Sequence, residues 1–428
     1  MGLFEKLRRR QEDTLPLADM NRDSGRSRIL FVSHEATRTG APKIILNILR
    51  HFNEKTTASL QSILHTGGFL AEEFVRHSET DCLNLPREPS EDLARRIRKL
   101  CTRYREDPPR LAFCNSMESR YIAYELYRLG IPIFFLIHEL PSSYEPADYQ
   151  SVYDCSRKIF FPVEAVRDAA HARLPLPAGK VEVMPQGLLD PDFGKRIARS
   201  TAREGIRNEL QLPADALIVL GCGTLDLRKG IDHFAGVART LLSRANLDRP
   251  VHFVWLGEGD RWTHSPYHYT MLDIEKTPAH GHVHFIGERQ DVEPWFSGSD
   301  AFLMTSRVDP FPCVIHEAMA SGLPVITFDQ NGGAASAIAD GAGLVAPYGD
   351  YRTASSLIEL IAQQPDVTEM IRQRALERVH NEYRFDHYAN RLIRFAEQFT
   401  RCELATGRLE TGQPGDGLSE RPGWARAA

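Results

Sequence analysis

Short apolar runs alternate with longer amphipathic stretches along most of this chain. The runs hold four to seven residues and are rich in valine, isoleucine, leucine and phenylalanine, which is typical of strands buried on both faces of a parallel sheet. The runs predicted as strands are 28–33, 58–64, 81–85, 110–114, 132–137, 157–161, 180–184, 216–222, 251–256, 283–286, 301–305 and 324–328. The predicted helices include 43–52, 313–321, 353–363, 367–381 and 386–399. This alternation predicts an α/β fold with parallel sheets.

The length of the chain, 428 residues, exceeds what one ordinary hydrophobic core organises, so two domains are expected. Pro185 and Gly187 interrupt the pattern between the two halves. Residues 1–27 are polar and irregular after a short basic opening, and residues 401–428 hold few apolar side chains. Both ends are therefore predicted to be flexible or disordered.

Composition narrows the class of protein. Apolar residues make up 42% of the chain and charged residues 25%, which is typical of a soluble globular protein, and the net charge of -5 argues against a nucleic-acid binder. The seven cysteines are scattered without a C-x-x-C pair, which favours reduced thiols over a disulfide framework or a zinc site. No apolar run could span a membrane, and the charged start lacks the apolar core of a secretory signal.

The first ten residues leave one alternative open for the location. Leu3, Phe4 and Leu7 lie beside four basic residues and could contact anionic lipid. A solvated leader without any membrane role explains the same residues. The expected location is therefore cytoplasmic, with a peripheral contact at the inner face of the membrane as the open alternative.

Candidate chemistry concentrates in one strand–loop–helix–strand unit of the second half. Asp309 lies in its loop, Pro312 suits the first helical position, and Glu317 lies about one turn inside the helix. The free N–H groups of Cys313 and Val314 would then form an anion site flanked by two carboxylates. The alternative is an ordinary acidic helix start with a solvated glutamate.

Two further loops and one histidine suit the same chemistry. Gly40 lies in the loop after the first predicted strand, and such strand-to-helix loops often bind phosphates. Arg228 and Lys229 lie in the first loop of the second half, where they are either an exposed basic turn or the charge that neutralises a leaving diphosphate. His138 follows a predicted strand and is either a turn residue or a side chain that faces the crevice of the sheet.

These motifs together resemble a known family. Asp309, seven residues and Glu317, followed by Ala-Met-Ala-x-Gly-x-Pro-Val, resemble the signature of the family 4 (group 1) retaining glycosyltransferases with the GT-B fold. The resemblance covers about residues 28–400. Further motifs in the family's order are Lys229-Gly230, Gly257-Glu258-Gly259, Gly332-Gly333 and the last strand at 341–347.

The resemblance implies two Rossmann-like α/β/α domains that face a central cleft, with a C-terminal helix that crosses back to the first domain. The expected divisions are a basic leader 1–27, an acceptor-side domain 28–187, a donor-binding domain 188–384, a crossover helix 385–400 and a disordered tail 401–428.

It also implies transfer of a sugar from a nucleotide-diphosphate sugar, with retention at the anomeric carbon. The expected catalytic residues are His138, Lys229 and Asp309, and the expected donor-binding residues are Gly40, Thr224, Arg228, Lys229, Glu258, Phe311, Cys313, Val314 and Glu317. Asp309 would contact the sugar, Glu317 the ribose hydroxyls, and His138 would line the acceptor side. The departing phosphate itself would help to deprotonate the acceptor.

The expected partners are a nucleotide sugar and a glycan, lipid-linked or small-molecule acceptor, as in polysaccharide biosynthesis. No metal or other cofactor is expected, because the Asp-x-Asp pair of metal-dependent glycosyltransferases has its only formal counterpart in Asp190 and Asp192, which follow no clear strand. A phosphorylase would need a pyridoxal lysine and a longer chain, and a nicotinamide oxidoreductase would need the missing G-x-G-x-x-G fingerprint. A catalytically inactive GT-B scaffold or partner subunit stays open, because Thr224 and Asp309 replace the family's usual arginine and glutamate.

Overall fold

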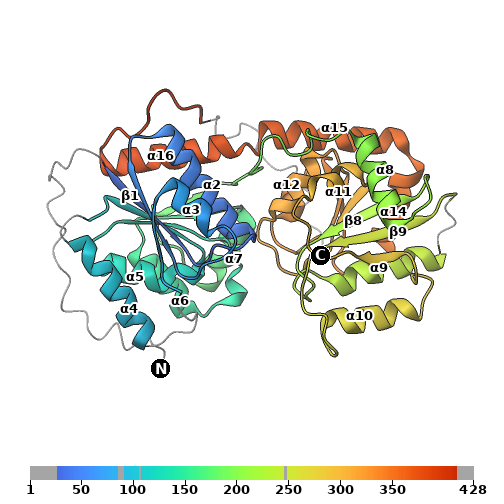
Figure 1. Ribbon diagram of the computed structural model, residues 1–428, viewed down its shortest axis with the longest axis horizontal. Helices are drawn as coiled ribbons and strands as arrows, with labels where there is room; N and C mark the ends of the chain where they lie inside the picture. The colour runs from blue at the N-terminus through green and yellow to red at the C-terminus, as the bar shows by residue number, and fades with distance from the viewer. Residues whose placement is uncertain (1–26, 85–90, 106–107, 245–247, 412–428) are drawn as a thin grey trace.

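The computed structural model describes residues 27–84, 91–105, 108–244 and 248–411. Figure 1 shows two α/β lobes side by side, each with a central sheet covered by helices. The expected leader and most of the expected tail, and with them the proposed membrane contact of the first ten residues, lie outside the described residues. Within the described residues, no helix combines the length and apolar character needed to cross a membrane.

The first domain is built on a seven-stranded parallel sheet in the order β3-β2-β1-β4-β5-β6-β7. The strands are β1 (Arg28–Ser33), β2 (Ser59–Leu64), β3 (Glu79–Cys82), β4 (Leu111–Asn115), β5 (Ile133–Leu136), β6 (Lys158–Phe161) and β7 (Val181–Val183). The helices are α2 (Gly40–Lys55), α3 (Ala71–His77), α4 (Glu91–Cys101), α5 (Arg120–Arg128), α6 (Pro146–Cys155) and α7 (Glu164–Arg173). A row of phenylalanine rings, with centroids 5.4, 5.6 and 5.7 Å from one to the next, fills one face: Phe31, Phe113, Phe134 and Phe160.

The second domain is built on a six-stranded parallel sheet in the order β10-β9-β8-β11-β12-β13. The strands are β8 (Leu217–Cys222), β9 (Val251–Leu256), β10 (Val283–Phe285), β11 (Ala301–Met304), β12 (Val325–Phe328) and β13 (Gly343–Ala346). The helices are α8 (Arg199–Leu210), α9 (Ile231–Arg244), α10 (Pro266–Glu275), α11 (Glu293–Gly298), α12 (Cys313–Ala320), α13 (Ala334–Ala337), α14 (Tyr351–Gln363) and α15 (Pro365–Asn381).

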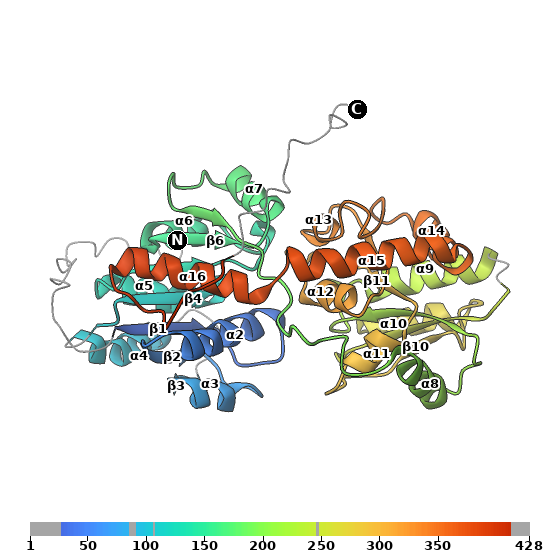
Figure 2. The same cartoon turned by 90° about the horizontal axis from the view of Figure 1, so that it is seen from above.

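The last helix, α16 (Phe385–Thr400), belongs to the first domain although it follows the second in the chain. The ring of Phe395 lies 5.4 Å from Phe160, and the ring of Phe399 lies 5.5 Å from Phe134. Figure 2 shows α15 and α16 one after the other along the same side of the molecule, across both lobes. The two parallel α/β domains and the returning helix expected from the resemblance are therefore both confirmed.

Both sheets reverse their strand order next to a central strand. β1 lies between β2 and β4, and β8 lies between β9 and β11, so successive connections lead away from β1 and β8 in opposite directions. Crevices outside the carboxyl ends of the strands open at such switch points and are the usual ligand sites of α/β sheets. The loops after β1, β8 and β11 lie at these crevices.

Several bounds differ from the sequence predictions: β3, for example, begins at Glu79 and not at Asp81. Three further differences concern two helix starts and the tail. α2 begins at Gly40 rather than Lys43, because a proline is tolerated in the first turn of a helix and Pro42 does not delay its start. Pro312 is the extended N-cap residue of α12, not its first helical residue. Residues 401–411 of the expected disordered tail pack on the first domain: Leu404 is buried, and its carbonyl accepts a 2.8 Å hydrogen bond from the N–H of Thr57.

Candidate active site

The loops after β8 and β11 bring a lysine and an aspartate together. Lys229 Nζ forms an ion pair with Asp309 Oδ2, and both side chains are largely buried, with exposed fractions of 16% and 10%. The backbone N–H of Lys229 donates a 2.6 Å hydrogen bond to Asp226, which fixes the turn that carries the lysine. Two of the three residues predicted as catalytic are thus in direct contact.

Two glycines allow these loops to approach each other. Gly230 has a φ of 75°, and a Cβ there would lie 2.1 Å from the carbonyl oxygen of Thr305. Gly332 has a φ of 122°, and a Cβ there would lie 2.1 Å from the carbonyl oxygen of Asp309. Any L side chain would be strained at both positions and would push the loops apart. The Lys-Gly and Gly-Gly motifs therefore set the position of the ion pair.

The start of α12 faces the first domain. Figure 1 shows this helix on the side of the second lobe that points toward the first. Among the described residues, no side chain caps its N-terminus, and Cys313 and Val314 are half-buried. A Cβ on Gly40 would lie 3.8 Å from Cys313 Sγ, so the start of α2 lies against the start of α12. Two helix N-termini, each with partial positive charge, therefore meet at the crevice.

Burial shapes the ionisation of this region. Burial raises the pKa of Glu317, while the positive charge of Lys43 on α2 opposes that rise. Burial also raises the pKa of the Cys222 and Cys313 thiols to about 12, so both are neutral at physiological pH. Lys43 and Lys229 bring positive charge from both domains to a region with neutral thiols.

The other predicted donor residues differ in their exposure and in their partners. Thr224 and Arg228 are exposed at the loop surface, and Arg228 Nη1 lies 3.4 Å from the carbonyl oxygen of Val308. Glu258 is paired with Arg261 at 2.7 Å, and this partner lowers the pKa of the glutamate.

Phe311 differs from them because its ring is buried. The ring lies 4.7 Å from the ring of His316, and the backbone carbonyl of Phe311 accepts a 3.1 Å hydrogen bond from Gln186 in the linker. Its side chain therefore belongs to the packing below the crevice.

His138 lies at the carboxyl end of β5 in the first domain. Its Nε2 lies 2.8 Å from Asn115 Oδ1, and Asn115 Nδ2 donates a 3.0 Å hydrogen bond to the carbonyl oxygen of Ala41. Since a carbonyl only accepts, the amide orientation of Asn115 is fixed, and His138 must carry its proton on Nε2. Burial and the nearby His34 lower the pKa of His138 to about 3, so the imidazole is neutral and Nδ1 keeps its lone pair.

Glu139, the next residue, fixes this loop through hydrogen bonds. Its carboxylate accepts hydrogen bonds from the Ser116 hydroxyl and from the N–H groups of Met117 and His138. Burial raises the pKa of Glu139, and these donors partly offset the rise. Glu139 therefore positions the histidine backbone and does not reach across the crevice itself.

Several of these contacts were missed from the sequence. Asn115 ends a predicted strand as His138 does, so the same argument from strand ends could have found it. No comparable signal marked Lys43, Gln186 or the pair of Arg38 and Glu288. That pair joins the two domains at 3.6 Å. Their roles depend on residues far away in the sequence.

Comparison with known proteins shows that part of this chain is similar to a known family. Residues 202–378 match the family Glycosyl transferases group 1. The group 1 match includes Lys229, Asp309 and Glu317 but not His138 or Gly40, so it covers the expected donor side of the crevice. The finer family 4 assignment stays a proposal.

Two curated relatives align over this same part of the chain. O-antigen biosynthesis glycosyltransferase WclY of Escherichia coli is 28% identical over 152 residues, which are 36% of this chain and 38% of the relative. Lipopolysaccharide core biosynthesis glycosyltransferase LpsE of Rhizobium meliloti is 30% identical over 176 residues, which are 41% of this chain and 46% of the relative. The chain therefore spans less than half the length of these relatives.

Solved structures match over both domains. Anabaena HepE in complex with UDP and glucose has a TM-score of 0.75 at 17% identity and covers 87% of this chain and 100% of its own. WaaG, described as a glycosyltransferase involved in lipopolysaccharide biosynthesis, has a TM-score of 0.65 at 14% identity, over 87% of this chain and 99% of its own. At such low identity these structures show the fold, which is GT-B.

Proposed function

We propose that this chain is a retaining glycosyltransferase that moves a sugar from a nucleotide-diphosphate sugar to a glycan, lipid-linked or small-molecule acceptor. The observation that carries the proposal is the contact between Lys229 and Asp309 beside the uncapped start of α12. A cation, a carboxylate and free N–H groups at the mouth of a two-domain crevice suit a diphosphate whose sugar must leave.

The residues on the donor side suit successive parts of such a substrate. The diphosphate would take the N–H groups of Cys313 and Val314 and would replace Asp309 as the partner of Lys229. Asp309, once released, would lie beside the sugar and stabilise positive charge at the anomeric carbon. Glu317, one turn further into α12, would accept hydrogen bonds from the ribose.

The acceptor side needs no protein base in this proposal. The departing phosphate would take the proton of the acceptor hydroxyl as the new bond forms, on the same face of the sugar that the phosphate leaves. His138, neutral and protonated on Nε2, offers Nδ1 only as a hydrogen-bond acceptor. That role suits the positioning of a hydroxyl group.

The names of the relatives support a surface-polysaccharide acceptor. A further E. coli relative, UDP-Gal:alpha-D-GlcNAc-diphosphoundecaprenol alpha-1,3-galactosyltransferase, is 28% identical over 154 residues, which are 38% of its length. It acts on a lipid-linked sugar, as its name states. We extend that class of acceptor to this chain, together with O-antigen and lipopolysaccharide core glycans.

Metal independence is part of the proposal. Lys229 and Arg228 supply positive charge at the expected diphosphate site, and the Asp-x-Asp pair lies in the linker, where Arg196 holds Asp190 at 2.5 Å. Excess EDTA should therefore leave turnover nearly unchanged. A complete loss of turnover that Mg²⁺ or Mn²⁺ restores would contradict this part.

A panel of nucleoside diphosphates in a thermal-shift assay tests the proposal. One of them should stabilise the protein in a saturable manner, by about 2.7 kcal/mol at a hundredfold excess over its Kd. Glu317→Ala should weaken that shift. The wild-type protein should hydrolyse the nucleotide sugars of the stabilising nucleotide slowly. An inactive scaffold predicts no saturable shift with any nucleotide.

A further inference from the structure

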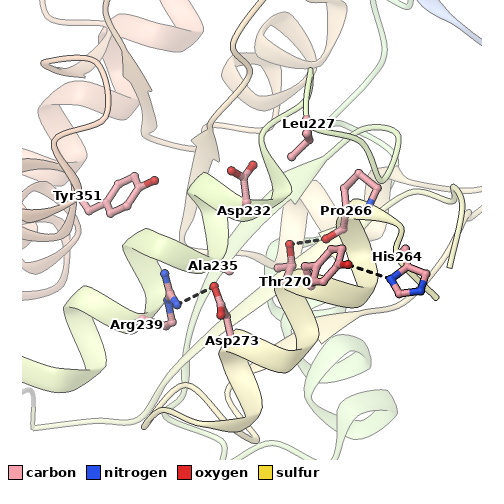
Figure 3. A pocket seen from close by; sticks show the side chains of 10 residues that line it. Leu227, Asp232, Ala235, Arg239, His264, Pro266, Thr270, Asp273 and Tyr351 are labelled. Atoms are coloured by element: carbon pink, nitrogen blue, oxygen red, sulfur yellow. Dashed lines mark hydrogen bonds and ion pairs between the residues drawn. The ribbon is translucent and has the colours of Figure 1, made fainter. Parts of the chain in front are cut away.

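A second concave site lies on the outer side of the second domain, between α9 and α10. Its volume is about 460 Å³, within the range of small-ligand pockets. Figure 3 shows side chains of both helices converging on it, with Leu227 at its rim and Tyr351 entering from the start of α14. It includes none of the residues that we assign to the donor.

The charged side chains of this pocket are already paired. Arg307 holds both carboxylate oxygens of Asp232, at 2.8 and 2.6 Å, and Arg239 holds Asp273 at 3.0 Å. An ionic ligand would have to break one of these pairs. A neutral ligand rich in hydroxyl groups would not, because both carboxylates remain partly exposed, at 35% and 62%, and can accept further hydrogen bonds.

Aromatic rings supply the second half of the recognition chemistry. Tyr269 on α10 is 53% exposed, and its hydroxyl lies 2.9 Å from Nδ1 of His264, whose φ of 74° is unusual for a residue other than glycine. Trp262, on the same loop as His264, is 80% exposed. The negative face of an aromatic ring attracts C–H groups of positive character, such as those on one face of a pyranose. The ring of Tyr269, held by His264 beside carboxylate acceptors, therefore matches a neutral saccharide.

The pocket and the proposed donor site share the loops after β8 and β11. Leu227 lies two residues before Lys229 on the same loop, and Arg307 lies two residues before Asp309. Arg307 joins both loops, because its Nη1 donates a 2.5 Å hydrogen bond to the Leu227 carbonyl while its guanidinium holds Asp232. A ligand in the pocket would thus lie beside the sugar-transfer site without occupying it.

We propose that this pocket is a subsite for a neutral sugar of the acceptor glycan, at a distance from the hydroxyl that reacts. The assignment of the sugar to the acceptor rests on the proposed glycosyltransferase function. The pocket holds the glycan through stacking on Tyr269 and hydrogen bonds to Asp232 and Asp273, and so favours acceptors longer than a single sugar.

Binding of neutral methyl glycosides tests the proposal on the full-length protein. The probes are the methyl glycosides of glucose, galactose, mannose, rhamnose and N-acetylglucosamine, measured by saturation-transfer NMR with UDP present. At least one should bind the wild type, and Tyr269→Ala should weaken it by about tenfold or more. Asp273→Asn should weaken it as well. Tyr127→Ala, which removes a tyrosine 40% exposed on the other domain, should leave binding unchanged.

Two results would overturn the subsite: no glycoside binds the wild type, or Tyr269→Ala binds as well as the wild type while its melting temperature is unchanged. The thermal shift with nucleoside diphosphates separates this outcome from a failure of the proposed function. If no nucleotide stabilises the protein but a glycoside binds through Tyr269, the donor chemistry is wrong and the saccharide pocket stands.

Discussion

The ion pair between Lys229 and Asp309 gives each residue a partner before any substrate arrives. Two charges that are largely buried cost free energy unless they are paired, so removal of either residue would leave the other as an unpaired buried charge. An incoming diphosphate then competes with Asp309 for the same ammonium group. Binding of the donor and release of the aspartate are therefore one event in the proposed reaction.

Substitutions of Asp309 separate charge from position. Asp309→Asn should leave the affinity for the stabilising nucleoside diphosphate equal or higher, because it removes a competing anion. It should lower kcat by roughly 10²-fold or more, because a charge near the anomeric carbon is lost. Asp309→Glu keeps the charge but moves it by about 1.5 Å, with a penalty of up to ~10²-fold. The measurements are kcat, nucleoside diphosphate affinity and melting temperature. Normal turnover in Asp309→Asn would reduce Asp309 to a structural partner of Lys229.

The hydrogen bond from His138 to Asn115 leads to a pH prediction. Asn115→Asp places a carboxylate beside the imidazole and should raise the pKa of His138 from about 3 toward neutrality. Protonation then removes the lone pair of Nδ1, so kcat/KM should fall about tenfold at pH 6 and recover as the pH rises. The wild type should show no such limb above pH 5. A uniform loss at every pH would mean that Asn115 only supports the fold.

At the scale of whole elements, the crevice depends on how closely the loops pack. Gly332→Ala should push the Asp309 loop away, with a cost of about 1–3 kcal/mol in unfolding free energy for the strained backbone and a large loss of kcat. Gly205→Ala is the matched control, because Gly205 lies in α8 and no atom of the described residues comes within 4 Å of the added carbon. The unfolding free energy of that control should rise by about 0.5–1 kcal/mol, and its activity should be unchanged. The measurements are denaturant unfolding and kcat of both variants. Equal values for Gly332→Ala and Gly205→Ala would contradict the prediction.

The buried side of α12 holds a histidine without polar contacts. His316 is fully buried, its ring lies 4.8 Å from that of Tyr383, and neither ring nitrogen has a hydrogen-bond partner among the described residues. Burial lowers its pKa to about 3, below the unfolded value of about 6.5. Because the pKa is lower in the folded state, the contribution of the neutral histidine to the unfolding free energy is fully present above pH 6.5. It is lost as the pH falls toward 3.

His316→Met should therefore become more stable than the wild type as the pH falls. The difference in unfolding free energy should grow by about 1.4 kcal/mol for each pH unit below 6.5, and should stay within about 1.5 kcal/mol at pH 8. Urea midpoints at pH 5 and pH 8 measure it. His280→Met changes an exposed histidine and should show no such growth. Parallel pH curves for His316→Met and the wild type would contradict the prediction.

Elements were predicted well from the sequence, and contacts between elements were not. Strands buried on both faces show as continuous apolar runs, so β1 and β9 were predicted with their observed bounds. The loop with Lys229 was found because glycines mark it, and the loop with Asp309 was found because its spacing to Glu317 resembles a family signature. Asn115 forms a hydrogen bond with Ala41, which lies 74 positions away in the sequence. Leu404 packs on the first domain from a segment with few apolar residues. Neither contact leaves a local pattern in the sequence.

For the whole molecule, the returning helix joins the two domains into one unit. α16 completes the core of the first domain with side chains such as Leu392, Ile393 and Ala396, all fully buried. Beside this helix, the two connections between the domains contact each other, since the N–H of Leu188 donates a 2.9 Å hydrogen bond to the carbonyl of Tyr383. Gly187, with a φ of 69°, makes that approach possible.

Truncation after Tyr383 should therefore unfold the first domain while the second keeps its fold. Loss of each buried aliphatic side chain of α16 removes about 1.5–3 kcal/mol, so several together exceed the usual stability of a domain. Limited proteolysis followed by mass spectrometry should show cleavage across 28–187 and protection of 199–381. Truncation after residue 411 is the control and should protect both. Equal protection in the two truncated chains would refute the role of α16.

The returning helix also affects how the protein is made. The ribosome completes the sheet of the first domain about 200 residues before it completes α16, a delay of roughly 10–40 s at ordinary rates of synthesis. During that interval, the row of phenylalanines that later receives Phe395 and Phe399 is open to solvent and to other nascent chains. The domain that is synthesised first is therefore the last to finish folding, and its yield in the cell should depend on chaperones that cover this surface until translation ends.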